Sequence, residues 1–293
     1  MGALTFLRAQ LAYYLLASLL TIPASLAVAQ PPLFSGLNQT GQGALESKTE
    51  EKEEDPGANG YGLPEAPKPA PANRKELGSA FTKAAPASIA DLRFIEQHVE
   101  TLITRVSPSV VAVEVGYGSG SGVVISADGL VLTAGHVCGK PNRSVRFTFA
   151  DGKTARGKTM GVDAESDTGL MRITDPGPWP HAVTGELQQA QSGDWVLALG
   201  HPGGFDLKRS LVVRLGRIIR LTSAKLQTDC TISPGDSGGP LFDMHGRVIG
   251  IHSAISFSMA DNFHVPITQF YDAWDQLANP SVDVNLEAQP RGN

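Results

Sequence analysis

The sequence predicts an all-β domain with one helix before its strands and one after them. Between about residues 106 and 266, short stretches rich in Val, Ile and Leu alternate with turn dipeptides such as Asp128-Gly129 and Asp151-Gly152. Helical periodicity flanks this region on both sides. Closely spaced short strands, with helices only at the ends, are typical of an all-β fold.

Each flanking helix is indicated by the spacing of its apolar residues. In residues 89–103 these recur every three or four positions, and Pro108 prevents the helix from continuing into the first strand. In residues 267–277 they again share one side of a helix. The periodic residues are Leu92, Ile95, Val99 and Leu102 in the first helix and Phe270, Ala273, Trp274 and Leu277 in the second. The folded domain is therefore expected to span residues 88–280.

The N-terminus is predicted to be an export signal. Arg8 precedes the apolar stretch 11–20, and Ala27-Val-Ala29 supplies the small residues expected before a cleavage site at Gln30. Residues 1–29 are thus interpreted as a signal peptide, which would place the mature protein in the periplasm or outside the cell. If this segment were not cleaved, its length would allow it to anchor the chain in a membrane.

Residues 30–87 and 281–293 are expected to lie outside the folded core. The first stretch combines an acidic run at 50–55 with a proline-rich spacer at 64–72. Such a composition buries too little apolar surface to offset the entropy of ordering, so it predicts a disordered linker. Residues 281–293 also lack apolar periodicity and are expected to form a flexible tail.

A serine within a glycine-rich turn is the strongest candidate for chemistry. The stretch Ser233-Pro-Gly-Asp-Ser-Gly-Gly-Pro-Leu-Phe242 centres on Ser237. A serine hydroxyl is a weak nucleophile and needs a neighbouring base and hydrogen-bond donors for the developing oxyanion. Gly235 can adopt backbone angles closed to other residues, which would let the N–H groups of Gly235 and Ser237 point to one place. Gly235, Asp236 and Ser237 are therefore the predicted oxyanion hole.

His136 and Asp167 are the candidate base and its supporting carboxylate. His136 follows the apolar run 129–133 in a Thr-Ala-Gly-His context and so lies where a strand ends. Asp167 opens the mostly apolar stretch 167–173, where a carboxylate can be held beneath an imidazole and select its tautomer. Asp163 is the rival carboxylate, but its polar surroundings favour a role in capping a turn.

The order His136, Asp167, Ser237 resembles that of the chymotrypsin-like serine proteases, and further motifs resemble their HtrA/Deg branch. The resemblance covers most of residues 88–280. Its motifs are Val106-Ser-Pro-Ser-Val-Val111, the glycine-rich stretch from Gly118 to His136, Leu199-Gly-His-Pro-Gly203, Gln227-Thr-Asp229, Val248-Ile-Gly-Ile251 and Phe263-His-Val-Pro266. Two features depart from the family. Asp236 stands where the family usually has Asn, and no PDZ-like module is expected after Pro266.

The resemblance implies two packed six-stranded antiparallel β-barrels, the first over about residues 106–178 and the second over about 181–266. It also implies an exported serine endopeptidase that acts on unfolded or exposed protein segments through an acyl-enzyme. His136 and Asp167 would come from the first barrel and Ser237 from the second. The alternative from another functional class is a chaperone-like peptide-binding protein on the same scaffold. A serine esterase would have its histidine last in the chain, and the order here is reversed.

The resemblance also places the pocket for the substrate side chain before the cut. One wall would be Cys230, Thr231, Ile232, Ser233 and Pro234, and the other Ser253, Ala254, Ile255 and Ser256, with Ser253 also supporting Asp167. His252 precedes the second wall in a Gly-Ile-His context similar to that of glutamyl endopeptidases, where a histidine contacts the substrate carboxylate. A preference for small aliphatic side chains is expected first and for acidic ones second. The alternative for His252 is a hydrogen-bonded position in the core.

The remaining features narrow the partners to proteins or peptides. The net charge of −5 and the lack of a basic cluster argue against nucleic acid. Arg214, Arg217 and Arg220 recur every third residue, but on a predicted strand they would alternate faces. The glycine run 116–122 leads into β-branched residues rather than a helix, so it predicts no nucleotide site. No cofactor and no metal are expected, since the histidines lack paired ligand spacing.

Assembly and disulfide bonding are left open by the sequence. HtrA-like proteases often form trimers through aromatic residues near the start of the domain, a role that Phe81 and Phe94 could fill. An exported chain permits a disulfide between its two cysteines, Cys138 and Cys230. Both lie near His136 or Ser237 in the sequence, so a bridge across the base of the cleft is one alternative. Two buried free thiols are the other.

Overall fold

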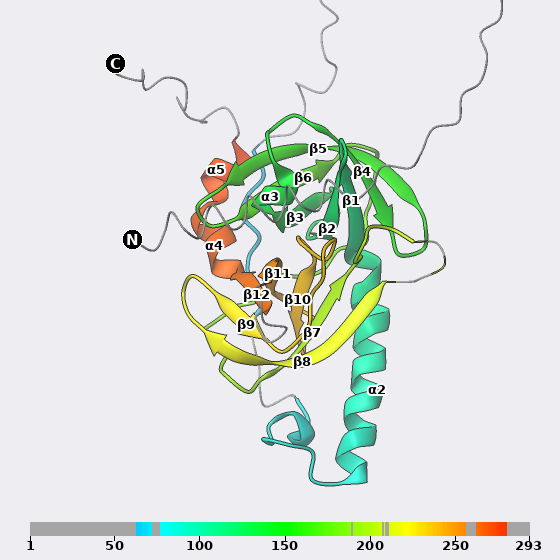
Figure 1. Ribbon diagram of the computed structural model, residues 1–293, viewed down its shortest axis with the longest axis vertical. Helices are drawn as coiled ribbons and strands as arrows, with labels where there is room; N and C mark the ends of the chain where they lie inside the picture. Colours follow the sequence, from blue (N-terminus) through cyan, green and yellow to red (C-terminus); the bar gives the residue numbers. More distant parts are fainter. Residues whose placement is uncertain are drawn as a thin grey trace, which may run out of the picture. The chain divides into compact units, whose positions relative to one another are not determined.

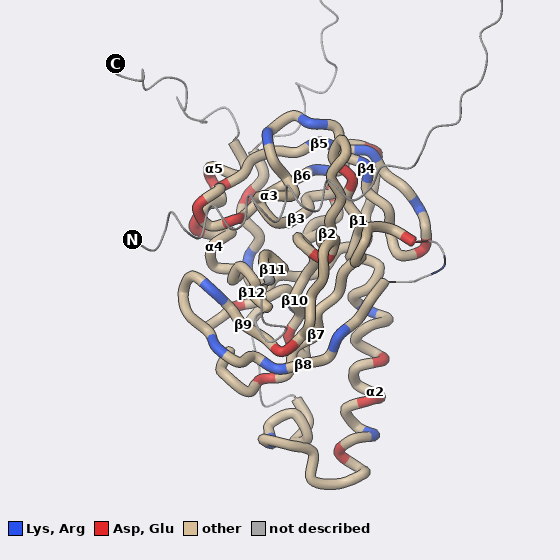
Figure 2. The backbone as a smooth tube through the Cα atoms, viewed as in Figure 1, with Lys and Arg blue, Asp and Glu red and all other residues tan. Residues whose placement is uncertain are grey.

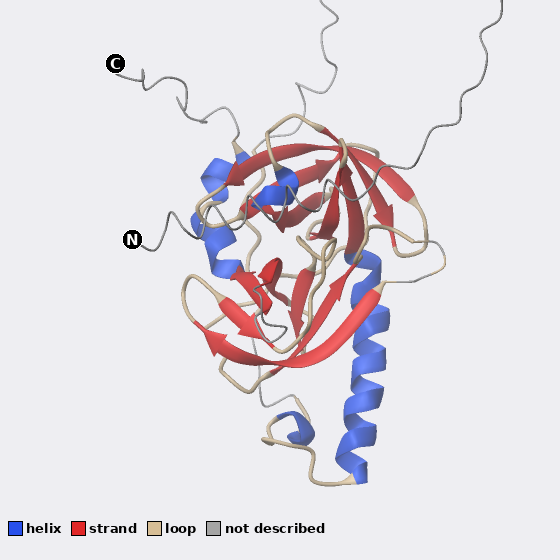
Figure 3. Cartoon of the chain, viewed as in Figure 1, coloured by secondary structure: helices blue, strands red, loops and turns tan. Residues whose placement is uncertain are grey.

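The computed structural model describes residues 63–71, 77–188, 190–206, 208, 211–255 and 262–279 (Figure 1). The predicted signal peptide, the acidic run at 50–55 and the tail 281–293 lie outside these residues. Strands make up most of the regular structure in the described part, and the longest helix flanks them (Figure 3). The prediction of an all-β fold is therefore confirmed.

The first barrel closes six antiparallel strands in the order β1-β2-β3-β6-β5-β4. These strands are β1 (Val110–Val115), β2 (Gly118–Val124), β3 (Leu130–Ala134), β4 (Ser144–Phe149), β5 (Thr154–Asp163) and β6 (Thr168–Ile173). Val113, Val131, Phe147 and Met171 come from four of them and are fully buried in one apolar cluster. Inward β-branched and aromatic side chains of this kind fill the interior of a small barrel.

The second barrel repeats this architecture in the order β10-β11-β12-β9-β8-β7. Its strands are β7 (Trp195–Gly200), β8 (Val212–Leu221), β9 (Leu226–Thr228), β10 (Pro240–Asp243), β11 (Val248–Ile255) and β12 (Asn262–Pro266). Val196, Ile218, Leu241 and Ile249 fill its interior. The predicted pair of six-stranded barrels is confirmed.

One apolar cluster joins the two barrels. Val123, Leu132 and Leu170 of the first barrel and Leu199 and Phe242 of the second belong to the same buried cluster, and all five are fully inaccessible. Burial of each such side chain stabilises the fold by roughly 1.5–3 kcal/mol. Because close-packed side chains tolerate little displacement, this cluster sets how the segments carrying His136 and Ser237 meet.

Helix α2 (Ile89–Val106) precedes the first strand and packs on the barrels through one face. Its N-terminus is capped by Ser88, whose Oγ accepts a hydrogen bond from the Asp91 N–H at 3.1 Å. The buried apolar residues are Ile95, Leu102 and Val106. Leu92, which the spacing assigned to the buried face, is 55% exposed. The 3-10 turn η3 (Ser107–Ser109), which contains Pro108, separates α2 from β1.

The C-terminal helix is interrupted. It consists of α4 (Ile267–Asp272) and α5 (Trp274–Ala278), and Ala273 between them has φ −90° and ψ 3°, outside helical geometry. The predicted single helix over 267–277 is wrong at this point. The predicted buried face is otherwise present, since Phe270, Trp274 and Leu277 are all buried.

Part of the predicted linker is ordered against the barrels. The Trp274 indole N–H donates to the Pro64 carbonyl at 2.8 Å, and the Ala70 N–H donates to the Thr184 carbonyl at 2.8 Å. Phe81, in the 3-10 turn η2 (Ser79–Phe81), is only 6% exposed. The expectation of disorder over all of 30–87 is therefore wrong for these residues. A proline-rich chain is extended and its carbonyls make no internal hydrogen bonds, so a side chain such as the Trp274 indole can bind them.

Candidate active site

Three segments from both barrels carry the candidate residues. His136 lies in the one-turn helix α3 (Gly135–Cys138) that directly follows β3. Asp167 lies in the turn between β5 and β6, next to Thr168, which pairs with Ala134 at the end of β3. This register places Asp167 beside His136. Ser237 belongs to the connection between β9 and β10 of the second barrel.

The His136 side chain is held by Asp167. The backbone N–H of His136 donates to Asp167 Oδ1 at 2.9 Å, and the ring Nδ1 lies 3.0 Å from Oδ1 and 3.1 Å from Oδ2. A carboxylate can only accept, so Nδ1 carries the proton and Nε2 keeps a lone pair that can accept one. The Ser253 hydroxyl donates to Asp167 Oδ2 at 2.5 Å, as the sequence predicted.

The environment of Asp167 favours its ionised form. Burial alone would raise the pKa of this carboxyl, but the hydrogen bonds from His136 and Ser253 outweigh burial, so its pKa is lowered. Its backbone has φ 57°, a left-handed conformation unusual for a residue other than glycine. The Asp167 carbonyl in turn accepts from the Gly135 N–H at 2.8 Å, which ties this turn to the start of α3.

Asp163 occupies a different place, at the end of β5 and four residues before Asp167. Its Oδ1 accepts from the Glu165 N–H at 3.0 Å, and its Oδ2 accepts from the Ser166 hydroxyl at 2.7 Å. Both bonds are local to the turn between β5 and β6. The geometry thus agrees with the turn-capping role expected for Asp163.

Close backbone packing brings the segments of His136 and Ser237 together. A Cβ on Gly238 would lie 2.1 Å from Thr133 Oγ1, and one on Gly120 would lie 2.8 Å from Val137 Cγ1 and 3.0 Å from the Ser237 carbonyl oxygen. Glycine is required at both positions because any side chain would separate the segments. Within the described part of the chain, His136 and Ser237 share no hydrogen bond. In ligand-free enzymes such bonds are often long and tighten only when substrate binds.

Ser121 is a residue of this site that the sequence analysis missed. It is fully buried on β2, and its N–H donates to the Ser237 carbonyl at 2.8 Å. Its hydroxyl donates to the Gly235 carbonyl at 2.8 Å and accepts from the His201 N–H at 2.9 Å. One serine of the first barrel therefore holds the residues on both sides of Asp236. In the sequence it is one of two serines in a glycine-rich strand, and nothing there singles it out.

The predicted oxyanion donors are oriented by the carbonyls of their own peptide units. The Pro234 carbonyl accepts from the Gly203 N–H and the Asp236 carbonyl from the Gly239 N–H, both at 2.8 Å. In a trans peptide the N–H and the carbonyl point in opposite directions. The Gly235 N–H therefore points away from Gly203, and the Ser237 N–H points away from Gly239.

Asp236 contributes no donor to this predicted hole. Its N–H donates to the Ser233 carbonyl at 2.9 Å, so its assignment to the oxyanion hole is wrong. Gly235, the third residue of this turn, has φ 97°, and a Cβ there would lie 2.4 Å from Gly203 N. The turn therefore requires glycine at 235 and uses the backbone of Asp236 to close.

Two predicted pocket residues lie in the core. Cys230 is 2% exposed and belongs to the interior cluster of the second barrel. His252 is fully buried, so the alternative of a hydrogen-bonded core residue is the one observed. Of the remaining wall residues, Thr231, Pro234 and Ala254 are exposed, Ser233 and Ser253 are partly buried and Ile232 is buried. The Ile255 side chain and Ser256 lie outside the described residues.

His252 pairs with a second imidazole. Its Nδ1 lies 2.9 Å from His264 Nδ1, its Nε2 lies 3.1 Å from the Leu199 carbonyl oxygen, and His264 Nε2 lies 2.8 Å from the Thr228 hydroxyl. A carbonyl only accepts, so His252 carries a proton on Nε2. Because the buried rings are neutral, His252 Nδ1 is bare and accepts from His264 Nδ1, and His264 Nε2 accepts from the Thr228 hydroxyl. Burial accordingly lowers the pKa of His264 to about 3 and that of His252 well below its ordinary value.

The two cysteines are free thiols in different barrels. Cys138 Sγ lies 3.4 Å from the Leu170 carbonyl oxygen in the first barrel, and Cys230 Sγ lies 3.7 Å from the Arg214 carbonyl oxygen in the second. The alternative of a disulfide is thus wrong, because both side chains point into their own barrel. Burial raises the pKa of Cys138 to about 12 and that of Cys230 to about 11.

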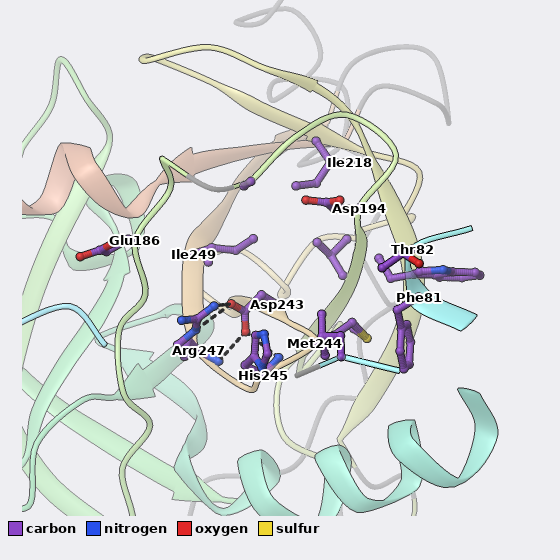
Figure 4. Close-up of a pocket in the computed structure, with 14 residues that line it drawn as sticks. Phe81, Thr82, Glu186, Asp194, Ile218, Asp243, Met244, His245, Arg247 and Ile249 are labelled. Carbon is purple, nitrogen blue, oxygen red and sulfur yellow. Dashed lines mark hydrogen bonds and ion pairs between the residues drawn. The ribbon is translucent and has the colours of Figure 1, made fainter. Parts of the chain in front are cut away.

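A pocket of about 60 Å³ lies beside η2 (Figure 4). Phe81, Ile218, Met244 and Ile249 supply much of its apolar lining. Of the charged residues that line it, Asp243 and Arg247 are bound to each other, with Nη2 2.5 Å from Oδ2. None of His136, Asp167 and Ser237 lines this pocket.

The described residues also lack two further features, a metal-binding cluster and a membrane-spanning helix. No cluster of three or more His, Cys, Asp or Glu side chains suited to a metal ion occurs among them. In the same part of the chain, no helix has the length and apolar character needed to cross a membrane. Charged residues of both signs are interspersed along α2 (Figure 2).

Comparisons with known proteins agree with this architecture. Residues 120–251 match the family model of the trypsin-like peptidase domain. A probable periplasmic serine endoprotease, DegP-like, of Pseudomonas fluorescens is 37% identical over 166 residues, which are 54% of this chain and 34% of the relative. The corresponding protein of Pseudomonas fulva is 32% identical over 233 residues, 73% of this chain and 48% of the relative. The structure of the HtrA-type protease AlgW with a tripeptide has a TM-score of 0.55 and 27% identity, covering 62% of this chain and 64% of that one.

The chain is therefore similar, over residues 120–251, to the trypsin-like peptidase domain. Its relatives and structural neighbours are DegP-like and HtrA-type serine proteases, as the sequence motifs predicted. The chain spans between a third and half of the length of these two curated relatives.

Proposed function

We propose that this protein is an exported serine endopeptidase of the HtrA type that cleaves unfolded or exposed protein segments. His136 Nε2 takes the proton of the Ser237 hydroxyl as its oxygen attacks the peptide carbonyl carbon. The Gly235 and Ser237 N–H groups stabilise the resulting oxyanion. His136 then gives the proton to the leaving amine, and an acyl-enzyme on Ser237 remains. Water, deprotonated by His136, releases the second product and restores Ser237.

The hydrogen-bonded group of His136, Asp167 and Ser253 carries this proposal. It fixes the imidazole with its proton on Nδ1 and leaves Nε2 to act as a base. Asp167 keeps its charge, as its lowered pKa requires, and stabilises the imidazolium that forms. A protein that only binds peptides would not need this arrangement.

Casein cleavage and labelling by a fluorophosphonate test the proposal. The chain is expected to degrade casein and to be labelled at Ser237, and Ser237→Ala should reduce cleavage by roughly 10,000-fold or more. The variant should keep the wild-type thermal unfolding midpoint, which separates loss of chemistry from loss of fold. Casein that is bound but never cut, with no labelling of Ser237, would instead establish the chaperone-like alternative.

We further propose a preference for small aliphatic side chains before the cut. The burial of His252 and its pairing with His264 support this order, because both ring nitrogens are already engaged within the barrel. A peptide-library digest read by mass spectrometry is expected to show cuts after Val, Ala or Ile. Cuts mainly after Glu that disappear in His252→Ala would restore the acidic preference.

Export and assembly complete the proposal. The names of the relatives support a periplasmic location. N-terminal sequencing of the exported protein should therefore begin at Gln30, whereas retention of residues 9–29 would indicate an anchor.

A trimer through aromatic residues would rest on Phe94, which is 43% exposed, since Phe81 is buried within the chain. Sedimentation of the wild type and of Phe94→Ala tests that assembly.

A further inference from the structure

A buried carboxylate directly precedes the proposed nucleophile. The Asp236 side chain is fully inaccessible, and its Oδ2 accepts from the Ser233 N–H at 2.8 Å. A Cβ on Gly200 would lie only 2.4 Å from Asp236 Oδ1, so the carboxylate lies directly against the end of β7. A buried carboxylate without a cation would be strongly unfavourable, so this position requires a partner.

Arg214 of β8 supplies that partner. Its Nη2 lies 2.8 Å from Asp236 Oδ2 and its Nη1 lies 3.3 Å from Oδ1, so the guanidinium faces both carboxylate oxygens. The Arg214 side chain is 18% exposed. Arg217, three residues further along β8, stacks on Trp195 instead, with 3.9 Å from its guanidinium carbon to the ring centre. The two arginines therefore have different surroundings on one strand.

The ion pair anchors the one residue that links the two predicted oxyanion donors. Asp236 lies between Gly235 and Ser237, whose carbonyls are both bound by Ser121 of the first barrel. Its own carbonyl accepts from Gly239 and thereby orients the Ser237 N–H. The backbone of this turn is thus held by residues of both barrels, and its buried side chain is held from the second.

We propose that Arg214 is a positioning residue for Ser237. By neutralising and orienting Asp236, it keeps the turn from Ser233 to Gly239 in the conformation that presents the Ser237 hydroxyl and the two N–H donors. Arg214 hydrogen-bonds neither to Ser237 nor to the predicted oxyanion donors among the described residues, and its guanidinium binds this turn through Asp236. This inference rests on the proposed function, because positioning matters only if Ser237 reacts.

The charge of Asp236 makes the inference specific. An arginine that merely packed on strand β8 would be needed whatever residue stood at 236. An arginine that neutralises a carboxylate is needed only while that carboxylate is present, since a neutral amide of the same shape requires no cation. The effect of removing Arg214 should therefore depend on whether residue 236 is Asp or Asn.

A double-mutant cycle on the full chain tests this dependence. The proteins are the wild type, Arg214→Gln, Asp236→Asn and the double variant. The readouts are the rate of fluorophosphonate labelling of Ser237, and kcat and KM for one peptide. With Asp at 236, Arg214→Gln should slow labelling and lower kcat by roughly 10- to 100-fold, with KM changed far less. In the Asp236→Asn background, the same replacement should change labelling by less than about threefold.

Controls separate this role from general instability. Arg217→Gln is the matched variant, because it removes an arginine of the same strand that does not contact Asp236, and its labelling should equal that of the wild type. Arg214→Lys should recover part of the labelling rate lost in Arg214→Gln, since lysine keeps the positive charge but lacks the planar guanidinium that binds both carboxylate oxygens. If Arg214→Gln does not fold, the comparison of Asp236→Asn with the double variant and the result for Arg214→Lys carry the test.

Two results would overturn the inference. One is an equal loss on removing Arg214 from the wild type and from the Asp236→Asn variant, and the other is a double variant that folds but remains far below Asp236→Asn. A failure of the proposed function gives a different pattern, because the wild type itself would then be neither labelled nor active on casein. In that case the positioning role is refuted together with the function.

Discussion

Acid is expected to destabilise this fold through the imidazole pair between β11 and β12. His252 and His264 lie opposite each other in the strand register, are buried, and share one hydrogen bond that requires a bare nitrogen on His252. Protonating His252 on Nδ1 would force His264 either to give up its Nδ1 proton or to break the shared hydrogen bond, and protonating His264 would displace the Thr228 hydroxyl proton from Nε2. Either event puts an unpaired charge in the barrel interior.

The size of the effect follows from the lowered pKa of His264. In the folded chain this pKa is about 3, against 6.5 for an ordinary histidine, so between these values the unfolded chain binds more protons. The contribution of His264 to the free energy of unfolding is therefore fully present above about pH 6.5 and is lost as the pH falls toward 3. At pH 4.5 the loss from His264 alone amounts to about 3 kcal/mol, and His252 shifts stability in the same direction.

Urea unfolding followed by tryptophan fluorescence, repeated from pH 8 to pH 4.5, measures this loss. The range stops at pH 4.5 because carboxylates with lowered pKa values, such as Asp167, lose their contribution mainly below their ordinary value of 3.8. His264→Gln is expected to be less stable than the wild type at pH 8 but to lose less stability on acidification. His181→Gln, which removes an exposed histidine, should lose as much unfolding free energy between pH 8 and pH 4.5 as the wild type does. If His264→Gln also lost as much as the wild type, the reasoning would be refuted.

Three further predictions concern the site and its supports. Asp167→Ala should abolish casein cleavage while Asp163→Ala remains active, and the reverse pattern would show that the wrong carboxylate was chosen. Deleting 30–62 should leave the thermal midpoint nearly unchanged, whereas deleting 30–87 should lower it, since burial of Phe81 alone contributes about 3 kcal/mol; equal midpoints would contradict this. Both cysteine thiols should resist Ellman's reagent in the native protein and react after unfolding, and a fast native reaction would contradict their burial.

The sequence by itself determined the classes of structure and the main candidate residues. Alternating apolar residues and turn dipeptides identified the strands, because these signals act over a few residues. The glycines around Ser237 predicted a tight turn for the same reason, and Gly235 does adopt a positive φ. The order of His136, Asp167 and Ser237, with the motifs around them, resembles that of the HtrA/Deg proteases, and this resemblance implied the two barrels.

Only the tertiary structure decided which distant side chains meet. His252 belongs to the core because His264 lies opposite it on the next strand, and the sequence around His252 contains no sign of that partner. Arg214 and Asp236 meet across 22 positions, and Ser121 holds the Gly235 carbonyl across 114. Local sequence patterns indicate the backbone conformation that a segment adopts. Whether a charge or an imidazole is functional or structural depends on its neighbours in space, which only the closure of the barrels brings together.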